Sequence, residues 1–212
     1  MLHEQDQIAE KEFLRAEVEF GPAFKASDAG LDRSMIGAYG QDDRVCAYTA
    51  LMAEIDEKEP LYTTVTVLTD KEEIGSCGNT GLDSNYVGDF IIWLAQGQGA
   101  DPKEVFRNSI CLSSDVNAAY DPTFHQVYEP RNASYINKGC VLTKYTGSRG
   151  NSGSHDASAE LLATIIGSMD RAGVRWQIGA LGAVDAGRDG TLATLVAAQT
   201  ADRAAVRLPV AA

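Results

Sequence analysis

The chain has 212 residues, of which 44% are hydrophobic and 23% are charged, as in a globular protein of one domain that buries a core. Acidic side chains outnumber basic ones by 30 to 18, and the net charge of −12 argues against nucleic acid and anionic membrane surfaces as partners, because both would be repelled. No apolar run approaches the roughly 20 residues that span a bilayer, and the polar, acidic start resembles neither a signal nor a transit peptide.

The cysteines are few and far apart. They stand at Cys46, Cys77, Cys111 and Cys140, and no two of them form a CxxC pair. Structural zinc sites usually draw on close pairs, and disulfide frameworks belong to small secreted chains. We therefore expect reduced thiols in a cytoplasmic protein.

Hydrophobic periodicity predicts alternating strands and helices in the first half of the chain. The alternation over Phe13–Phe20 predicts a strand, and a Gly-rich stretch then leads to a helix over Asp42–Glu57 with acidic residues in its first turn. The β-branched run Leu61–Leu68 predicts a buried strand, and Tyr86–Gln96 predicts a helix.

The second half continues the alternation, and both tryptophans, Trp93 and Trp176, are expected in the core. The remaining predicted elements are strands over Ser109–Leu112, Cys140–Tyr145 and Val174–Ile178, and helices from Asp156, as N-cap, to Arg171 and over Thr191–Ala201. Long crossovers separate the strands. We therefore predict an α/β fold with a mainly parallel sheet flanked by helices on both faces.

Acidic residues gather where a ligand of such a sheet would bind, beyond the carboxyl ends of the strands. The segment Asp70–Glu73 follows one predicted strand, Asp115 follows another, and Asp42 or Asp43 begins a helix. Three acidic segments that converge would repel one another. Divalent cations remove that repulsion, and a bridged pair of zinc ions is the solution that aminopeptidases use.

The adjacent carboxylates Glu72 and Glu73 suit such a site. Neighbouring side chains point in different directions, so one carboxylate can bind metal while the other takes a proton from water. The alternative for this short segment is a solvated charged loop without a ligand.

The Gly- and Ser-rich segment Gly147–Ser154 is a second candidate site. Its backbone suits an anion, and Lys144 and Arg149 lie near it in the sequence. The segment lacks the Walker spacing of a phosphate-binding loop. The alternative is a turn between a strand and a helix, and a nucleotide-binding domain would rest on this segment alone.

Five consecutive blocks of the sequence carry a family resemblance. They read GLDRSMIGAYGQDDRVCAYTAL, DKEEIGSCGNTG, SSDVNAAYDPTF, VYEPRNASYINKGCVLTKYTGSRGNSGSHDASAE and WQIGALGAVDAGRDGT. In order and spacing they resemble the aspartyl aminopeptidase and aminopeptidase I family of zinc metallopeptidases. The resemblance implies an α/β catalytic domain interrupted by a smaller β domain. Residues 1–26 would then be the tail of that inserted domain or an edge strand, 27–199 the catalytic-type domain and 200–212 a tail of low information.

The resemblance also implies an activity and a ligand set. The family releases N-terminal residues, often acidic ones, from peptides, and it assembles into large homo-oligomers. It implies two zinc ions per subunit, with cobalt or manganese as alternatives. Asp43 would bridge the two ions, with Asp42 the less favoured neighbour. Glu73 would bind one ion, Asp115 would bind the other, and Glu72 would be the general base.

The ligand count predicts an incomplete site within these 212 residues. Two further metal-binding histidines of the family lie in blocks that find no match here, and His155 stands where the family more often has Ser or Asn. Each zinc would keep two protein ligands, whereas catalytic zinc usually has three. We therefore expect impaired metal binding and little peptidase activity from this chain alone. The alternative function is a non-catalytic assembly or binding protein that retains the peptidase fold.

Overall fold

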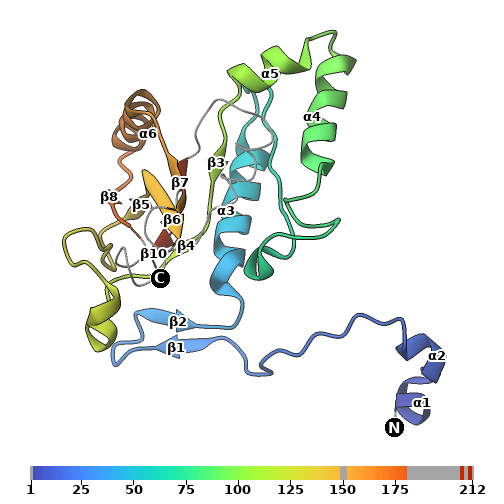
Figure 1. The fold of residues 1–212 in the computed structure, drawn as a ribbon. Coiled ribbons are helices and arrows are strands. Elements are labelled where there is room, and N and C mark those ends of the chain that lie inside the picture. The colour runs from blue at the N-terminus through green and yellow to red at the C-terminus, as the bar shows by residue number, and fades with distance from the viewer. Residues whose placement is uncertain (1, 149–151, 181–205, 208–209, 212) are drawn as a thin grey trace. The chain divides into compact units, whose positions relative to one another are not determined.

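The computed structural model describes residues 2–148, 152–180, 206–207 and 210–211 (Figure 1). The chain divides into two compact units, Met1–Gln41 and Asp42–Ala212. The first unit carries a short hairpin, and the second carries the acidic segments singled out above.

The first unit consists of two short helices, an irregular stretch and a β-hairpin. Its elements are α1 (Leu2–Asp6), α2 (Glu10–Phe13), β1 (Ser27–Ala29) and β2 (Met35–Gly37). The two strands pair antiparallel, with Asp28 opposite Ile36. The strand expected over Phe13–Phe20 is wrong, because α2 ends at Phe13 and residues 14–26 form no strand. An alternating pattern needs a partner strand, and the described residues of this unit pair only within the hairpin.

The helices of the second unit are mostly those that the sequence predicts. They are α3 (Gln41–Asp56), η1 (Glu72–Ile74), α4 (Tyr86–Gly97), α5 (Pro102–Asn108), η2 (Pro122–Val127) and α6 (Ala159–Arg171), where η marks a 3-10 helix. Helices α3, α4 and α6 confirm the expected ones. Among the described residues, no helix combines the length and the apolar character that crossing a bilayer requires.

Two side chains define helix starts that the sequence analysis placed differently or missed. The hydroxyl of Ser158 accepts a hydrogen bond of 3.1 Å from the Leu161 amide, so Ser158 caps α6 and the expected cap at Asp156 is wrong. The Asp101 carboxylate accepts from the Lys103 amide at 3.0 Å and caps the unexpected helix α5. Each cap satisfies an amide that the first turn would leave without a partner.

The described strands of the second unit pair two by two. They are β3 (Leu112–Ser113), β4 (Val116–Asn117), β5 (Cys140–Leu142), β6 (Tyr145–Ser148), β7 (Ser152–Asp156), β8 (Trp176–Ile178), β9 (Val206–Arg207) and β10 (Val210–Ala211). Strands β3 and β9, β4 and β10, and β5 and β8 pair parallel, whereas β6 and β7 pair antiparallel. The loop expected over Gly147–Ser154 is therefore largely a hairpin, with residues 149–151 outside the described part.

The best-packed region of the second unit joins β5, β8 and α6. Val141 and Leu142 are completely buried, with 0% of their surface exposed. Apolar side chains of α6 and Trp176 of β8 pack against Leu142. Gly139 precedes β5 with a φ of +102°, and a Cβ there would overlap the carbonyl group of Arg175. The Cys140 amide donates to that carbonyl at 3.0 Å, so β5 starts in close backbone contact with the segment that enters β8.

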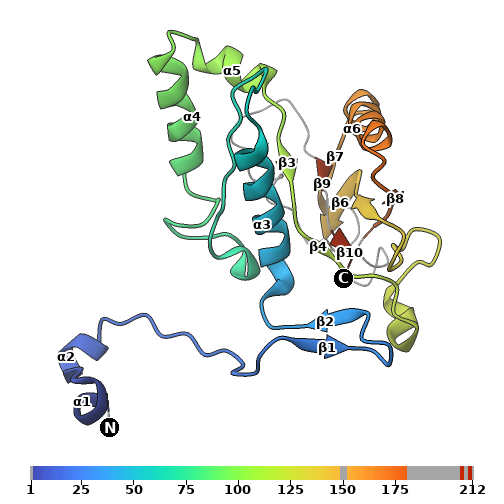
Figure 2. The same cartoon turned by 180° about the vertical axis from the view of Figure 1, so that it is seen from behind.

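The expected buried strand over Leu61–Leu68 is wrong as a strand. The segment is extended but has no strand partner among the described residues, and most of its side chains are exposed. It runs back along α3, as the views of Figure 1 and Figure 2 both show. The hydroxyls of Thr64 and Thr66 donate to the two carboxylate oxygens of Glu54, at 2.6 and 3.0 Å, and so attach the segment to α3.

Three other expectations meet different outcomes. Trp93 is 66% exposed on α4, so its expected burial is wrong, whereas Trp176 packs against the core. The helix expected over Thr191–Ala201 lies outside the described residues. Of the tail of low information, the short strands β9 and β10 are described, and they pair with β3 and β4.

Candidate metal centre

Three carboxylates from distant parts of the sequence meet in the second unit. One ligand oxygen from each of Asp42, Asp43 and Asp115 lies within 4.8 Å of the others. Asp42 is exposed, Asp43 and Asp115 are partly buried, and the Oδ1 atom of Asp43 is shielded from water. Two of the three expected acidic segments therefore converge.

The start of α3 presents two of these carboxylates. Helical geometry is interrupted at Asp42, whose φ and ψ are −78° and 113°, and the peptide bond between Asp42 and Asp43 is cis. Beyond this point the helix continues to Asp56, and Cys46, three residues after Asp43, is 1% exposed. The helix therefore buries a side chain within one turn of Asp43.

The third carboxylate stands on a segment that is held at several points. Asp115 lies between β3 and β4, and its Oδ1 accepts from the Val116 amide at 2.6 Å. Asn117 is 1% exposed and donates from Nδ2 to the Ser134 hydroxyl at 2.7 Å. The Tyr120 amide donates to the Ser134 carbonyl at 2.8 Å. These bonds fix the backbone that follows Asp115.

The third expected segment lies on the loop between residues 69 and 85. Glu72 and Glu73 begin the 3-10 helix η1, where Glu72 is partly buried and Glu73 is exposed. In the described part of the chain, neither of them belongs to the group of three aspartates. The structure thus brings the expected Asp43 and Asp115 together and leaves Glu72 and Glu73 outside that group.

Asp42, the less favoured neighbour of Asp43, also lies in this group. A carboxylate oxygen of Asp42, like one of Asp43, lies within 4.8 Å of the other ligand oxygens of the group. The signal was present in the sequence, because two adjacent aspartates stand at one helix start. Adjacency alone does not say which of the two faces a ligand, and the structure brings both within reach.

The donor set fits a divalent cation. Two oxygens bound to one zinc at about 2.0–2.2 Å lie at most about 4.4 Å apart, so a small side-chain rotation would bring these carboxylates onto a common ion. Without a cation, two charges no more than 4.8 Å apart repel by at least about 3 kcal/mol at an effective dielectric constant near 20. Asp43 and Asp115, the two expected ligands in this group, would hold the ion, with Asp42 beside them.

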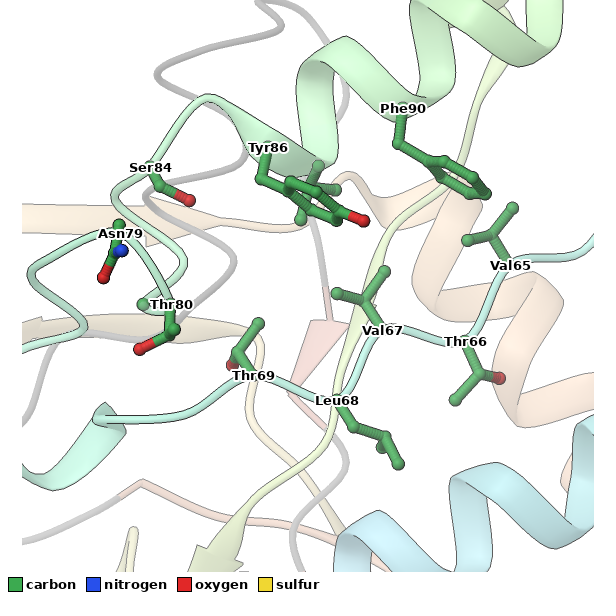
Figure 3. Close-up of a pocket in the computed structure, with 12 residues that line it drawn as sticks. Val65, Thr66, Val67, Leu68, Thr69, Asn79, Thr80, Ser84, Tyr86 and Phe90 are labelled. Atoms are coloured by element: carbon green, nitrogen blue, oxygen red, sulfur yellow. The ribbon is translucent and has the colours of Figure 1, made fainter.

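A groove of about 430 Å³ lies beside the loop that carries Glu72 and Glu73. The extended segment from Val65 to Thr69 forms one wall, and Tyr86 and Phe90 of α4 form the opposite wall (Figure 3). Val65 and Val67 face the aromatic rings, and Asn79 and Thr80 close one end. The groove is mostly apolar and offers no carboxylate to a metal.

The candidate anion site, Gly147–Ser154, lies in a hairpin and is described only in part. The loop between Lys144 and Asp156 forms the β6–β7 hairpin, and the side chains of Arg149 and His155 lie outside the described part. The described residues therefore neither support nor contradict nucleotide binding at this segment.

Comparison with known proteins identifies the family. Residues 1–204 match the family described as aminopeptidase I zinc metalloprotease (M18). Two relatives, each described as a probable M18 family aminopeptidase 1, come from Clostridium acetobutylicum and Thermotoga maritima; they are 45% identical over 201 residues and 41% identical over 207 residues. The alignments cover 93% and 95% of this chain but only 43% and 46% of the relatives. The chain thus spans less than half the length of these relatives.

Solved structures agree. The crystal structure of aminopeptidase I from Clostridium acetobutylicum matches 99% of this chain and 45% of its own, with a TM-score of 0.90 and 42% identity. The M18 aminopeptidase of Thermotoga maritima matches 99% of this chain and 47% of its own, with a TM-score of 0.91 and 39% identity. The mApe1 dodecamer of yeast covers 89% of this chain and 42% of its own at a TM-score of 0.67 and 26% identity.

The fold is therefore that of a class of zinc metalloproteases, and the expected α/β class is confirmed. Within that class, the chain belongs to the M18 aminopeptidase family.

Proposed function

We propose that the chain carries the metal-binding and catalytic residues of an aminopeptidase that hydrolyses the first peptide bond of a peptide. The meeting of Asp42, Asp43 and Asp115 within 4.8 Å, in a chain of the M18 family, carries this proposal. Two zinc ions per subunit, bridged by Asp43, with Glu73 on one and Asp115 on the other, complete it; cobalt or manganese are the alternative metals.

In peptide hydrolysis, Glu72 and the aspartates would have separate roles. Bound zinc would supply a Lewis acid and lower the pKa of a water. Glu72 accepts the proton of the attacking water as the oxygen bonds to the scissile carbonyl carbon. When the C–N bond breaks, Glu72 returns this proton to the leaving amine. The aspartates hold the metals and compensate their charge.

The setting of the activity is also part of the proposal. We propose N-terminal acidic residues as preferred substrates, a cytoplasmic location and a homo-oligomer, for which the yeast dodecamer is the precedent. Residues 1–26 as the tail of an inserted β domain and 27–199 as the catalytic-type domain belong to the same proposal.

Zinc titration calorimetry tests the metal site. We expect the 212-residue chain to bind zinc weakly, because the residues assigned here give each ion two protein ligands. D43N and D115N should each weaken binding by at least about tenfold, since even the loss of groups that only orient a ligand costs that much. The matched control is D56N, at the exposed end of the same helix α3. Two tight sites in the wild type would contradict the ligand count, and unchanged binding in D115N would contradict the site.

Hydrolysis of aspartyl and leucyl chromogenic substrates, with zinc or cobalt added, tests the chemistry. E72Q should lower the rate by about 10²–10⁴-fold while zinc binding persists, because Gln keeps the shape and cannot take a proton. Activity that survives E72Q would refute the assigned base. Zinc binding without hydrolysis of either substrate would favour the alternative, a non-catalytic assembly or binding protein on the peptidase fold.

A further inference from the structure

The loop that carries Glu72 and Glu73 folds back on itself. The Ser76 amide donates to the Lys71 carbonyl at 2.7 Å, and the Asp83 amide donates to the Ser76 carbonyl at 3.0 Å. The first bond closes the outgoing limb around η1, and the second ties that limb to the returning limb.

The loop is also closed at its base. The Thr80 hydroxyl donates to Oδ2 of Asp70 at 3.3 Å, two residues before Glu72. Figure 3 shows Asn79 and Thr80 on the returning limb, beside Thr69 of the extended segment. The base of the loop is therefore held by a side-chain bond that is independent of the backbone bonds above it.

The crossing point of the two limbs admits only glycine. A Cβ at Gly81 would overlap the carbonyl group of Ser76, and the neighbouring Cys77 carbonyl lies 2.6 Å from that position. Ser76 is 4% exposed and Leu82 is 5% exposed, so both limbs are buried at the point where they meet. Ser76 itself has a φ of +57°, which few residues other than glycine adopt. The limbs are in direct backbone contact.

We propose that Thr80 and Gly81 are positioning residues that fix the direction in which η1 presents Glu72 and Glu73. The inference rests on the proposed function, since it assigns these two residues to the support of Glu73 as a zinc ligand. Neither residue contacts a metal or a substrate in this account. They act by clamping the limbs of the loop at the Asp70–Thr80 bond and at the Ser76–Gly81 contact.

Zinc affinity and amide exchange of the full 212-residue chain test the clamp. T80V removes the hydroxyl and keeps the shape, and we expect it to weaken zinc binding several-fold and to speed exchange at the Ser76 and Asp83 amides. T80S should restore both. G81A should weaken zinc binding by at least tenfold. The matched control is G88A on α4, where a Cβ meets nothing within 4 Å and zinc binding should not change.

A double mutant separates positioning from general loss of structure. If Thr80 acts through Glu73, T80V should have no further effect on zinc affinity once E73Q is present. Wild-type affinity in both T80V and G81A, or an equal effect of T80V with and without E73Q, would overturn the inference alone. An E73Q variant that binds zinc like the wild type would overturn the proposed ligand set, and the inference would fall with it.

Discussion

Two segments with similar strand-like sequences differ sharply in the second unit. Cys140–Leu142 pairs with Trp176–Ile178 and buries Val141 and Leu142 completely. Leu61–Leu68 is longer and richer in β-branched residues, yet it stays unpaired among the described residues, with Val67 43% exposed. Strand propensity measures how well side chains suit a pleated surface, and a neighbouring strand decides whether that surface exists.

The two segments also differ in the elements that pack against them. Strand β5 is covered by α6, whose apolar side chains and Trp176 surround Leu142. The segment Leu61–Leu68 is attached to α3 only through Glu54 in the hydrogen bonds described above, and its valines face the open groove of Figure 3. We therefore expect most of the stability to reside in the paired region, and four predictions test this.

The largest effect is expected from L142A. Removing a fully buried leucine side chain costs about 2–5 kcal/mol of unfolding free energy. V67A, in the unpaired segment, should cost less than about 1 kcal/mol, because the side chain is 43% exposed. Urea denaturation of the two variants measures the difference. Equal losses would show that the two segments contribute alike to the unfolding free energy, contrary to this expectation.

The next effect is expected from S158A at the start of α6. The lost cap should lower the unfolding free energy by about 1 kcal/mol, since the Leu161 amide loses its acceptor. Thermal unfolding measures the loss, and S158D should recover most of it because aspartate also caps helices. The matched control S168A removes a hydroxyl within the same helix and should have a smaller effect.

A smaller effect is expected from E54A. The variant removes both acceptors of Thr64 and Thr66, but these bonds are largely exposed, so the cost should stay below about 1 kcal/mol. Limited proteolysis should cut residues 61–68 faster, whereas hydrogen exchange in β5 should not change. D56A, on the same helix, is the control. Faster exchange in β5 as well would mean that the two segments are coupled.

The smallest effect is a pH dependence in β5. Burial raises the pKa of the Cys140 thiol above its ordinary value of 9.0. The folded state then holds the proton more tightly than the unfolded state, so this contribution to stability is complete below pH 9 and is lost as the pH rises beyond it. Urea midpoints between pH 8 and pH 10 should fall less in C140A than in the wild type. A steeper fall in C140A would contradict the assigned cause.

The features that the sequence predicts correctly are those set by residues close together in the chain, such as helices. Helices α3 and α4 follow from periodicity, and Asp115 follows a strand, β3, as the sequence predicts. Strand partners were not predictable in this way, because β3 and β4 pair with residues beyond 205. This dependence on distant residues also explains why the strands expected over Phe13–Phe20 and Leu61–Leu68 are wrong.

Only part of the candidate site could be predicted from the sequence. Asp43 and Asp115 meet as expected, and Asp42 joins them because both aspartates stand at one helix start. The position of Glu73 depends on a loop with left-handed residues at Lys71 and Ser76, where φ is 65° and 57°. Neither residue type favours that conformation, so composition gave no warning of the path of the loop.

The close backbone contact between Gly139 and Arg175 has a consequence for the order of folding during synthesis. Strand β5, helix α6 and strand β8 are all contained in residues 139–178, so a growing chain holds the whole cluster around Leu142 once this stretch has left the ribosome. The partners of β3 and β4 are translated later. The pairings of β3 and β4 would therefore form after this cluster, and a pause in translation before residue 206 would leave the cluster folded while β3 and β4 still lacked their partners.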